Sequence, residues 1–453
     1  MVSGKQHIVR AREAALKALV RHEEDQAFLN LILPGITGSL PVKEKALAVQ
    51  LASGTIQRLN TLDWVLNLFS KTKIEKLTPW IRNLLRLSAY QLLYLDRVPA
   101  YAAIDEAVRL SRRYGHKGVA GLVNAVLRRL EKEKDLLPWP EAKQNPVAFL
   151  SLRYSLPPWL AAKTVKRFGF ERAETWARAV NLKPALSVRP NILRTSPEEV
   201  IDLLRKEGCS PEPSPLVPGM IRIVSSGYSP PQSNVFQQGL ITVQGESSAL
   251  VAPLLGVEPG AVVTDLCSSP GGKTTHIAEL MSNEGLVYAV EIHSARLRLV
   301  EKAAVRLGID IIRAIKGDGR LAASLNLGST GAVLVDAPCS GLGVIGRLPE
   351  IKWRRLPGKI PAFQKEQLAL LYAAASILPP GGRLLYSVCS TEPEETSDVV
   401  SLFNQGHGEF IEEPVVDRLP EGLREKTAPG PAHHIWPDLH GLDGFFIALW
   451  RRR

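Results

Sequence analysis

The feature that most constrains the fold is a glycine-rich loop between an apolar segment and a helix-like segment. The loop reads Asp265-Leu-Cys-Ser-Ser-Pro-Gly-Gly-Lys273, and the apolar run 262–266 leads directly into it. Further strand-like runs lie at 286–292, 311–315, 332–338, 383–388 and 445–450, with helix-like segments at 294–307 and 364–378. Strands that alternate with helices predict a parallel, doubly wound, Rossmann-like α/β sheet that binds ligands at the carboxyl ends of its strands. We expect 445–450 to add an antiparallel strand.

The first 135 residues predict helices only. Apolar residues recur at helical spacing in 7–21, 43–57, 79–95 and 116–130. The short connections between these segments favour a compact all-α bundle. The polar, proline-containing stretch 136–146 is interpreted as a linker.

A small mixed region follows the linker. Strand-like runs at 185–189 and 220–224 flank a helix at 197–207, and the proline-rich stretches 211–218 and 229–231 predict loops. The sequence therefore predicts a multidomain chain in three parts: a helical bundle at 1–140, a small α+β region at 146–240 and an α/β catalytic domain at 241–453.

Charge is unevenly spread over these parts. The net charge is +11, made up of +9 in 1–145, +5 in 146–240 and −3 in 241–453. An upstream basic surface suits a polyanion such as RNA, although a solvated surface gives the same excess. Six basic residues surround a Tyr-Gly-His turn, where they either grip phosphates or cover the outer faces of two helices: Arg109, Arg112, Arg113, Lys117, Arg128 and Arg129.

The sequence does not support a membrane protein, a metal-binding protein or a disulfide-stabilised protein. No run approaches the roughly 18 uncharged apolar residues of a membrane span. The charged N-terminus does not resemble a signal peptide. The four cysteines are far apart and form no Cys-x-x-Cys pair, which argues against a zinc site and a disulfide framework. We expect a cytoplasmic enzyme with reduced thiols, no metal and no membrane partner.

Three nucleotide-binding interpretations of the loop differ in the residues they require. The first, a phosphate-binding P-loop, needs glycine five positions before Gly272, where this chain has Cys267. The second, a Rossmann dinucleotide site, needs a Gly-x-Gly-x-x-Gly fingerprint, which this chain lacks. The third interpretation, S-adenosylmethionine (SAM), fits better. Glycines allow the backbone to approach a cofactor closely, Glu291 can accept the ribose hydroxyls, and Asp318 can accept the adenine amine.

Two cysteines follow later apolar runs in similar contexts, Asp336-Ala-Pro-Cys-Ser340 and Ser387-Val-Cys-Ser390. A buried cysteine is usually inert. Two thiols at matching strand ends beside a cofactor loop favour a catalytic role instead. A thiolate that adds to carbon 6 of a pyrimidine activates carbon 5 for methylation, and Asp336 can hydrogen-bond the ring nitrogen. The residues alone leave open whether Cys339 or Cys389 attacks, because DNA cytosine methyltransferases use the Pro-Cys thiol.

These motifs, together with Phe236–Ser248, resemble the RsmB/Sun family of 16S rRNA (cytosine-C5)-methyltransferases. The segments Pro99–Val108 and Gly121–Arg128 resemble a NusB-like RNA-binding domain. The resemblance covers nearly the whole chain. It implies that Cys389 is the nucleophile and that Cys339 assists release of the covalent adduct.

The same resemblance implies a SAM site, an RNA partner and the fold of the middle region. The residues implied to bind SAM are Cys267, Ser268, Ser269, Pro270, Gly271, Gly272, Lys273, Glu291, Asp318 and Asp336. Small-subunit rRNA is the implied substrate, and the middle region is expected to resemble an RNA-recognition fold. We expect a monomer.

Some positions depart from the family pattern, and two other functions remain open. Val388 stands where the family has threonine, and Gly245 stands where it has aspartate. The segment Gly346–Trp353 keeps the family's Lys-Trp and predicts a lid over the target base, or a simple lid loop. The alternatives are a ribosome-assembly factor with dispensable methylation and a transfer-RNA 5-methylcytosine methyltransferase. The intact cysteine pair argues against the first.

Overall fold

The computed structural model describes residues 3–224, 228–424 and 430–453. The chain divides into two compact units, Met1–Asn181 and Leu182–Arg453, which are described separately. Among the described residues, no helix has both the length and the apolar character needed to cross a bilayer.

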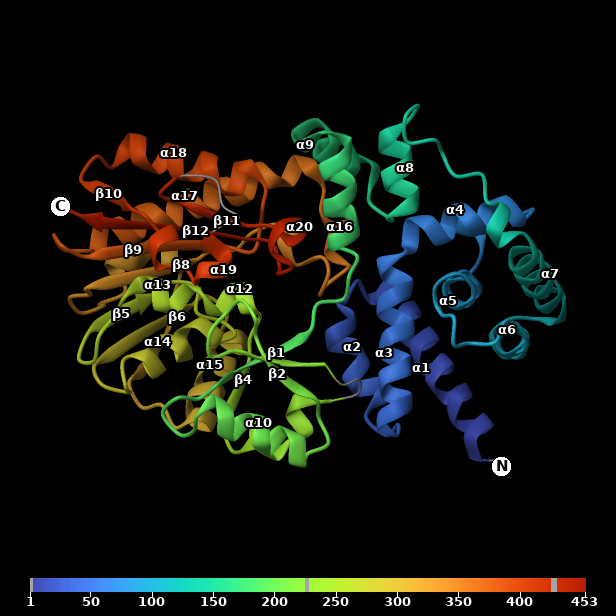
Figure 1. The fold of residues 1–453 in the computed structure, drawn as a ribbon, viewed down its shortest axis with the longest axis horizontal. Helices are drawn as coiled ribbons and strands as arrows, with labels where there is room; N and C mark the ends of the chain where they lie inside the picture. The colour runs from blue at the N-terminus through green and yellow to red at the C-terminus, as the bar shows by residue number, and fades with distance from the viewer. Residues whose placement is uncertain (1–2, 225–227, 425–429) are drawn as a thin grey trace. The chain divides into compact units, whose positions relative to one another are not determined.

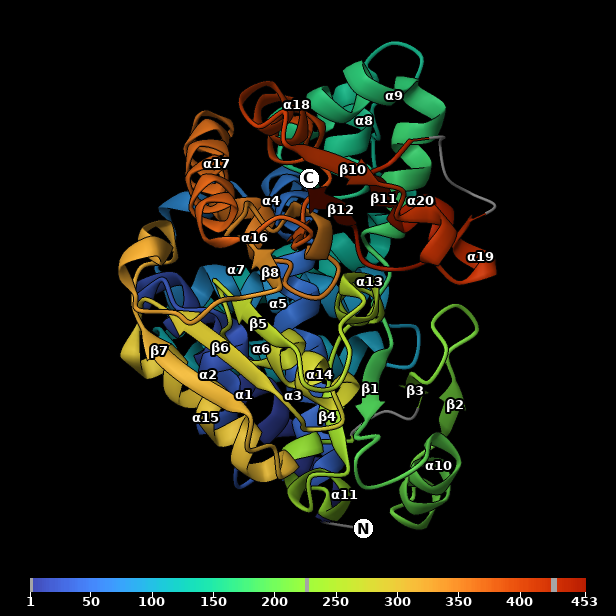
Figure 2. The same ribbon diagram turned by 90° about the vertical axis from the view of Figure 1, so that its left-hand side faces the viewer.

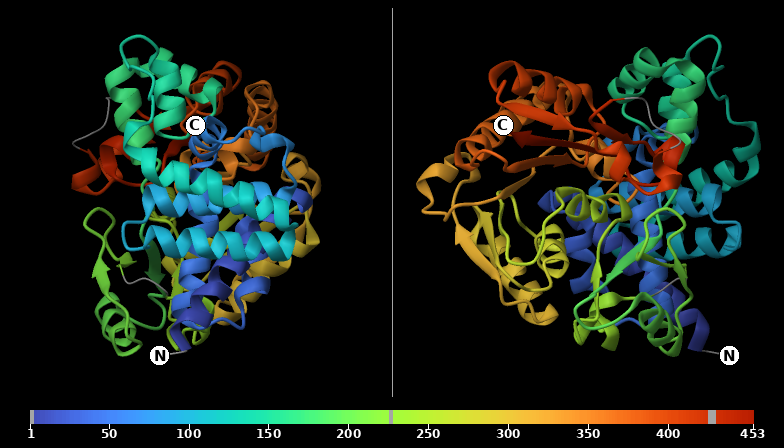
Figure 3. Two further views of the ribbon diagram at one scale, coloured as in Figure 1. Left: turned by 90° about the vertical axis from the view of Figure 1, so that its right-hand side faces the viewer. Right: turned by 60° about the vertical axis from the view of Figure 1, so that its left-hand side comes forward.

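The first unit is built from helices, and its described residues contain no strand (Figure 3, blue to green). Leu16, Leu51 and Leu85 recur on inward faces and are fully buried, as helical spacing requires. The four helices predicted in this part are confirmed. The helices are α1 (Ser3–Asp25), α2 (Leu29–Thr37), α3 (Val42–Gln57), α4 (Leu59–Phe69), α5 (Pro79–Tyr94), α6 (Ala100–Tyr114), α7 (Lys117–Glu133), α8 (Pro146–Arg153) and α9 (Pro158–Ala179).

The second unit begins with a small antiparallel sheet in the order β2-β3-β1-β4. Its strands are β1 (Leu186–Pro190), β2 (Pro211–Pro213), β3 (Ile221–Ile223) and β4 (Ile241–Val243). Helix α10 (Pro197–Lys206) covers this sheet, with Val200 and Leu204 buried against Val188 and Ile221. An α+β region was predicted here, and this arrangement confirms it.

Two predicted loops of this region were wrong in part. Residues 211–213, expected in a loop, form β2. Proline cannot donate to a neighbouring strand, but β2 lies at the sheet edge, where only one side is paired. The stretch 229–231 is mostly a 3-10 turn, η3 (Pro230–Gln232), which leads into α11 (Asn234–Gln237).

The large sheet of the second unit has the order β10-β12-β9-β8-β5-β6-β7, and β11 pairs with β12. Pairing is parallel from β7 to β9, which confirms the predicted doubly wound sheet, and β12 runs antiparallel to β9. Figure 2 shows β5, β6 and β7 side by side. The strands are β5 (Val262–Asp265), β6 (Leu286–Glu291), β7 (Ile312–Lys316), β8 (Ala332–Asp336), β9 (Arg383–Val388), β10 (Phe410–Glu413), β11 (His433–Ile435) and β12 (Phe445–Arg452).

Helices cover both faces of this sheet (Figure 1). Leu385 packs with residues of α13 and α14, whereas Leu384 and Tyr386 pack with α17 and α18 on the other face. This alternation follows from the two-residue period of a strand. The helices are α12 (Glu246–Ala249), α13 (Val251–Leu255), α14 (Gly272–Leu280), α15 (Ser294–Leu307), α16 (Ile351–Arg354), α17 (Ile360–Ile377), α18 (Ser397–Gly406), α19 (Glu421–Arg424) and α20 (Pro437–His440).

Candidate active site

The predicted site residues gather at the carboxyl ends of five adjacent parallel strands. The loop 267–273 follows β5, and Glu291 ends β6, its neighbour on one side. Asp336 ends β8, the neighbour on the other side. In a parallel sheet these ends form one edge, so the loop lies between the acidic strand ends and the thiol-bearing ones.

The loop after β5 is held in one shape by local hydrogen bonds. The amide of Ser268 donates to the carbonyl of Val290 at 3.0 Å, which ties the loop to β6. Gly271 has φ 103°, and a Cβ there would lie 3.2 Å from Cα of Val300. A side chain at this position would therefore strain the backbone and crowd α15. Helix α14 begins at Gly272, so its N-terminal amides face the site.

A buried carboxyl group, Asp265, anchors this loop from below. It accepts hydrogen bonds from the Thr274 hydroxyl at 2.7 Å and the Cys267 amide at 3.3 Å. Burial raises the pKa of Asp265 to about 7. Burial is also the largest cause that raises the pKa of the Cys267 thiol, and the charge of Asp265 is the second largest. Cys267 is therefore a protonated, inert part of the loop wall at neutral pH.

The two predicted acidic residues stand on neighbouring strands. The Glu291 side chain is buried and accepts the His293 amide at 2.9 Å. The amide of Gly317 donates to the Glu291 carbonyl at 3.2 Å, which places Asp318 beside Glu291. Arg320 donates to Asp318 at 2.6 Å, and this hydrogen bond lowers the pKa of Asp318. Asp318 therefore remains charged across the neutral range.

These carboxylates and helix amides fit SAM chemically. Carboxylate oxygens accept hydrogen bonds from ribose hydroxyls and from an adenine amine, which are the donors that the nucleoside offers. The N-terminal amides of α14 suit the carboxylate of the methionine part. Among the described residues, no cluster of three or more histidine, cysteine or carboxylate side chains has a metal-binding arrangement.

Asp336, at the end of β8, is held on both carboxylate oxygens. The ammonium of Lys273 donates to Oδ2 at 2.6 Å, and the Ser387 hydroxyl donates to Oδ1 at 2.7 Å. Lys273 therefore links the predicted cofactor loop to the predicted catalytic aspartate. Ser387 was not identified from the sequence. Its hydroxyl stands one position before Val388, where the family has threonine, and Val388 itself is buried.

The two thiols meet at the ends of β8 and β9. The sulfur atoms of Cys339 and Cys389 are 3.3 Å apart, within hydrogen-bonding distance for sulfur. The pKa of Cys339 is raised well above its ordinary value, first by the hydrogen bond with Cys389 and then by burial. A protonated Cys339 that donates to Cys389 explains this direction, because such a bond favours the thiol form.

A buried arginine that was not identified from the sequence supports the cofactor loop. Arg189, on β1, forms an ion pair with Glu279 of α14 at 2.7 Å. It also donates to the Gly272 carbonyl at 2.9 Å, to the Thr275 hydroxyl at 3.2 Å and to the Gln244 side chain. The small sheet thereby fixes the first turn of the helix that follows the glycine loop.

The lid segment Gly346–Trp353 lies largely inside the second unit. Lys352 is fully buried, and its ammonium is 5.1 Å from the Trp353 ring centre. Arg347 forms an ion pair with Asp443, and a Cβ on Gly245 would lie 3.3 Å from a carboxylate oxygen of Asp443. Stacking of Trp353 on a target base remains a prediction.

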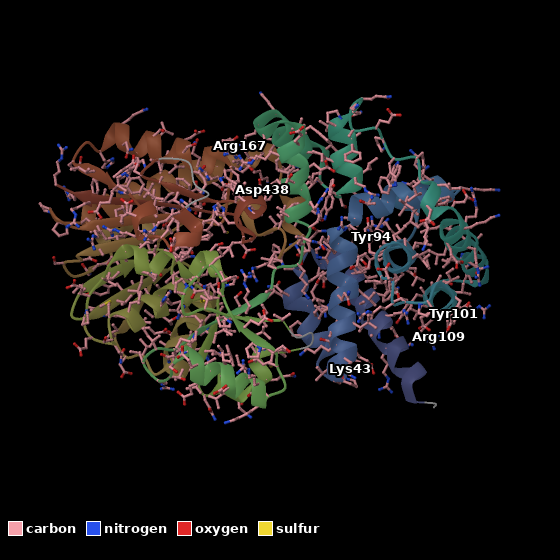
Figure 4. All side chains as sticks on the ribbon, viewed as in Figure 1. Lys43, Tyr94, Tyr101, Arg109, Arg167 and Asp438 are labelled. Carbon is pink, nitrogen blue, oxygen red and sulfur yellow. The ribbon has the colours of Figure 1, made fainter. Side chains whose placement is uncertain are left out.

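Four of the basic residues predicted on α6 and α7 are exposed and take part in ion pairs: Arg109, Arg113, Arg128 and Arg129. Arg109, labelled in Figure 4 near Tyr101 of the same helix, pairs with Glu106 at 2.7 Å. Arg113 pairs with Glu13 at 3.1 Å. These pairs suit the interpretation as outer helix faces, and the exposure also leaves the arginines accessible to phosphates. The side chain of Lys117 lies outside the described residues.

The chain is similar to known proteins over nearly its whole length. Residues 252–451 match the family described as 16S rRNA methyltransferase RsmB/F. The probable ribosomal RNA small subunit methyltransferase B of Bacillus subtilis (strain 168) is 36% identical over 446 residues, which cover 98% of both chains. The chain belongs to the RsmB/F family of 16S rRNA methyltransferases. Membership makes it a SAM-dependent rRNA methyltransferase, and it confirms the predicted family and cofactor.

The other domains of this RsmB/F family member also match known models. Residues 9–132 match the NusB family, and residues 156–228 match the ferredoxin-like domain of RsmF/B-like methyltransferases. The crystal structure of PH0851 has a TM-score of 0.82 at 29% identity and covers 98% of this chain and 99% of that one. A methyltransferase homologue from Pyrococcus horikoshii has a TM-score of 0.59 at 29% identity, covering 67% of this chain and 98% of that one.

Proposed function

We propose that this RsmB/F protein transfers the methyl group of SAM to carbon 5 of a cytosine in 16S rRNA through a covalent bond to Cys389. The observation that carries the proposal is the 3.3 Å separation of the Cys339 and Cys389 sulfurs at adjacent strand ends, beside Asp336. Carbon 5 of cytosine is a weak nucleophile, so the enzyme must first activate it.

Cys389 supplies that activation as the nucleophile. Its thiolate forms a bond to carbon 6, and the electrons of the carbon 5–carbon 6 double bond make carbon 5 nucleophilic. The loop 267–273, Glu291 and Asp318 would hold SAM, which when bound would supply the methyl group to carbon 5 and leave as S-adenosylhomocysteine. As the thiolate adds, nitrogen 3 takes up a proton from solvent, which it returns when the adduct is released. The carboxylate of Asp336 accepts a hydrogen bond from this N3–H and so favours the addition, with Lys273 and Ser387 fixing its orientation.

Cys339 then assists release. The largest cause of its raised pKa is the hydrogen bond with Cys389. Once Cys389 is a thioether, that cause is gone, so Cys339 gives its proton to solvent more readily. Its thiolate accepts the carbon 5 proton, the carbon 5–carbon 6 double bond re-forms, and the sulfur–carbon 6 bond breaks to return the Cys389 thiolate. The original protonation states of both sulfurs are thereby restored.

The substrate assignment rests on family names and on the geometry of the site. The curated relative from Bacillus subtilis is named for the small ribosomal subunit. A cytosine stacked in a helix cannot reach a thiol at a strand end, so the target base must be flipped out or lie in a loop. Transfer RNA remains the competing substrate.

Cysteine variants test the covalent mechanism. With SAM and substrate RNA, Cys339→Ala should accumulate a covalent protein–RNA complex on a denaturing gel, and Cys389→Ala should give none. Cys209→Ala, which changes a cysteine of the small sheet region, serves as the matched control and should behave as the wild type. The opposite pattern would exchange the roles of the two thiols.

Mapping the modified base tests the substrate. Bisulfite sequencing compares total RNA from cells with and without this gene. The cells without the gene should lack one 5-methylcytosine in 16S rRNA that the cells with it contain. A loss confined to transfer RNA would support the competing substrate. If inactive Cys389→Ala restored normal ribosome assembly in the deleted strain, the role would instead be that of an assembly factor.

A further inference from the structure

A buried carboxylate behind the two thiols has no part in the mechanism proposed above. Glu395 ends the 3-10 turn η7 (Pro393–Glu395), which follows β9, and its side chain is fully buried. It accepts the Ser340 amide at 2.6 Å and the hydroxyls of Ser340 and Ser390, both at 2.5 Å. Gln367 of α17 donates to it as well, at 3.2 Å.

These donors come from the two segments that carry the cysteines. Ser340 directly follows Cys339, and Ser390 directly follows Cys389. Their hydroxyl oxygens lie 3.2 Å apart on the carboxylate of Glu395, and the neighbouring sulfurs lie 3.3 Å apart. One carboxylate therefore joins the end of β8 to the end of β9 at the level of the thiols.

Burial makes this junction stiff. A buried carboxylate is tolerated only when hydrogen-bond donors replace the water that it has lost. If the two segments moved apart, Glu395 would lose donors from one of them, so the segments are held together by the cost of leaving a charge unsolvated. Further bonds hold the same parts: Arg355 donates to the Ser340 carbonyl at 2.6 Å, and the Tyr386 hydroxyl donates to the Glu395 carbonyl at 2.7 Å.

We propose that Glu395 is a positioning residue that holds Cys339 at the sulfur of Cys389 and so governs release of the covalent adduct. This inference rests on the proposed function. Addition to carbon 6 needs Cys389 and Asp336, whereas release needs the sulfur of Cys339 close to the carbon 5 proton. Loss of the hydrogen bonds from Ser340 and Ser390 to Glu395 should therefore slow release more than addition.

The test compares Glu395→Gln with Glu395→Leu. Glutamine keeps the shape and one acceptor oxygen but loses the charge, so Glu395→Gln should lower kcat by about tenfold, the effect of weakening a hydrogen bond to a charged group. The KM values for SAM and RNA should stay within about twofold of wild type, as for an interaction that matters after binding. Covalent complex should accumulate on denaturing gels. Glu395→Leu should show a larger effect, so the conservative variant rescues part of the activity.

Two further variants separate positioning from folding. Ser390→Ala removes a single hydroxyl donor from Glu395 and should also accumulate adduct. This variant keeps the test open if Glu395→Leu fails to fold. Asp398→Asn makes the same carboxylate-to-amide change on the exposed first turn of α18 and should leave kcat and adduct level unchanged.

The outcomes are distinct from those of the proposed function. If Cys389→Ala keeps its activity, the covalent mechanism itself is wrong. If the cysteine variants behave as proposed but folded Glu395→Gln and Ser390→Ala turn over and release adduct like the wild type, the positioning role is overturned. A rise in KM for SAM with unchanged kcat and no adduct would also overturn it, because Glu395 would then only support the cofactor pocket.

Discussion

Replacing Arg189 with methionine should destabilise the second unit and weaken SAM binding together. Arg189 and Glu279 are both buried, and their ion pair spans 2.7 Å. Removing one partner of a buried pair typically costs about 3–5 kcal/mol, because the other charge stays buried without its partner. Burial already raises the pKa of Glu279, and Arg189 opposes that rise, so loss of Arg189 should raise the pKa of Glu279 further.

Urea unfolding and SAM titration measure the two effects. We expect Arg189→Met to lower the free energy of unfolding by about 3–5 kcal/mol. We expect SAM affinity to fall by about tenfold, or roughly 1.4 kcal/mol, because Arg189 no longer holds the Gly272 carbonyl at the start of α14. Replacing Glu279 with leucine in the same chain should recover more than half of the lost stability, since no buried charge then remains.

The matched control is Arg205→Met on α10. Arg205 forms an ion pair with Asp202 at 3.2 Å, but both side chains are more than 60% exposed. An exposed pair contributes about 0–1 kcal/mol, so this variant should be close to wild type. If Arg189→Met were no less stable than Arg205→Met, the reasoning about the buried pair would be refuted. Unchanged SAM affinity in a destabilised Arg189→Met would refute the link to the cofactor loop.

Three further changes test other parts of the site. Ser387→Ala removes one hydrogen bond to the Asp336 carboxylate and should lower kcat about tenfold in methyl-transfer assays, and unchanged turnover would show that Lys273 alone orients Asp336. Because Asp265 has a pKa raised to about 7, its contribution to stability falls as pH rises from about 4 to 7, where Asp265 ionises in the unfolded chain before it does in the folded one. Asp265→Asn lacks this term, so its unfolding free energy should improve relative to wild type by up to about 4 kcal/mol over that range, and a pH-independent difference would contradict the shift. Gly245→Asp places a second carboxylate beside Asp443 and should lower the melting temperature, whereas an unchanged melting temperature would show that the local ion pair accommodates it.

The fold was largely predictable because its strands are continuous apolar runs. Both ends of the strand 383–388 were predicted correctly, because a strand buried on both faces is a continuous apolar run that differs from its polar surroundings. The short strands β10 and β11 escaped prediction, because each pairs at the margin of the sheet and carries polar residues. β2 escaped because its prolines indicate a loop, and only its edge position makes them acceptable.

Candidate site residues could be proposed from the sequence where they lie in contiguous motifs, and not where they depend on distant partners. The cysteine and glycine motifs are local, and the structure places both thiols together. Glu395 lies in a run of acidic residues that is typical of an exposed turn, and its partner Ser340 is 55 residues away. Arg189 and Glu279 are 90 residues apart. No local pattern indicates that such residues are buried against each other.

The covalent step is best tested with substrate RNA that carries 5-fluorocytosine at the target position. Fluorine at carbon 5 cannot leave as a proton does, so the adduct formed after methyl transfer cannot resolve. Digestion and mass spectrometry of the trapped complex should find the RNA attached to the peptide that contains Cys389. Attachment to Cys339, or methyl transfer with no attached peptide, would contradict the proposed mechanism.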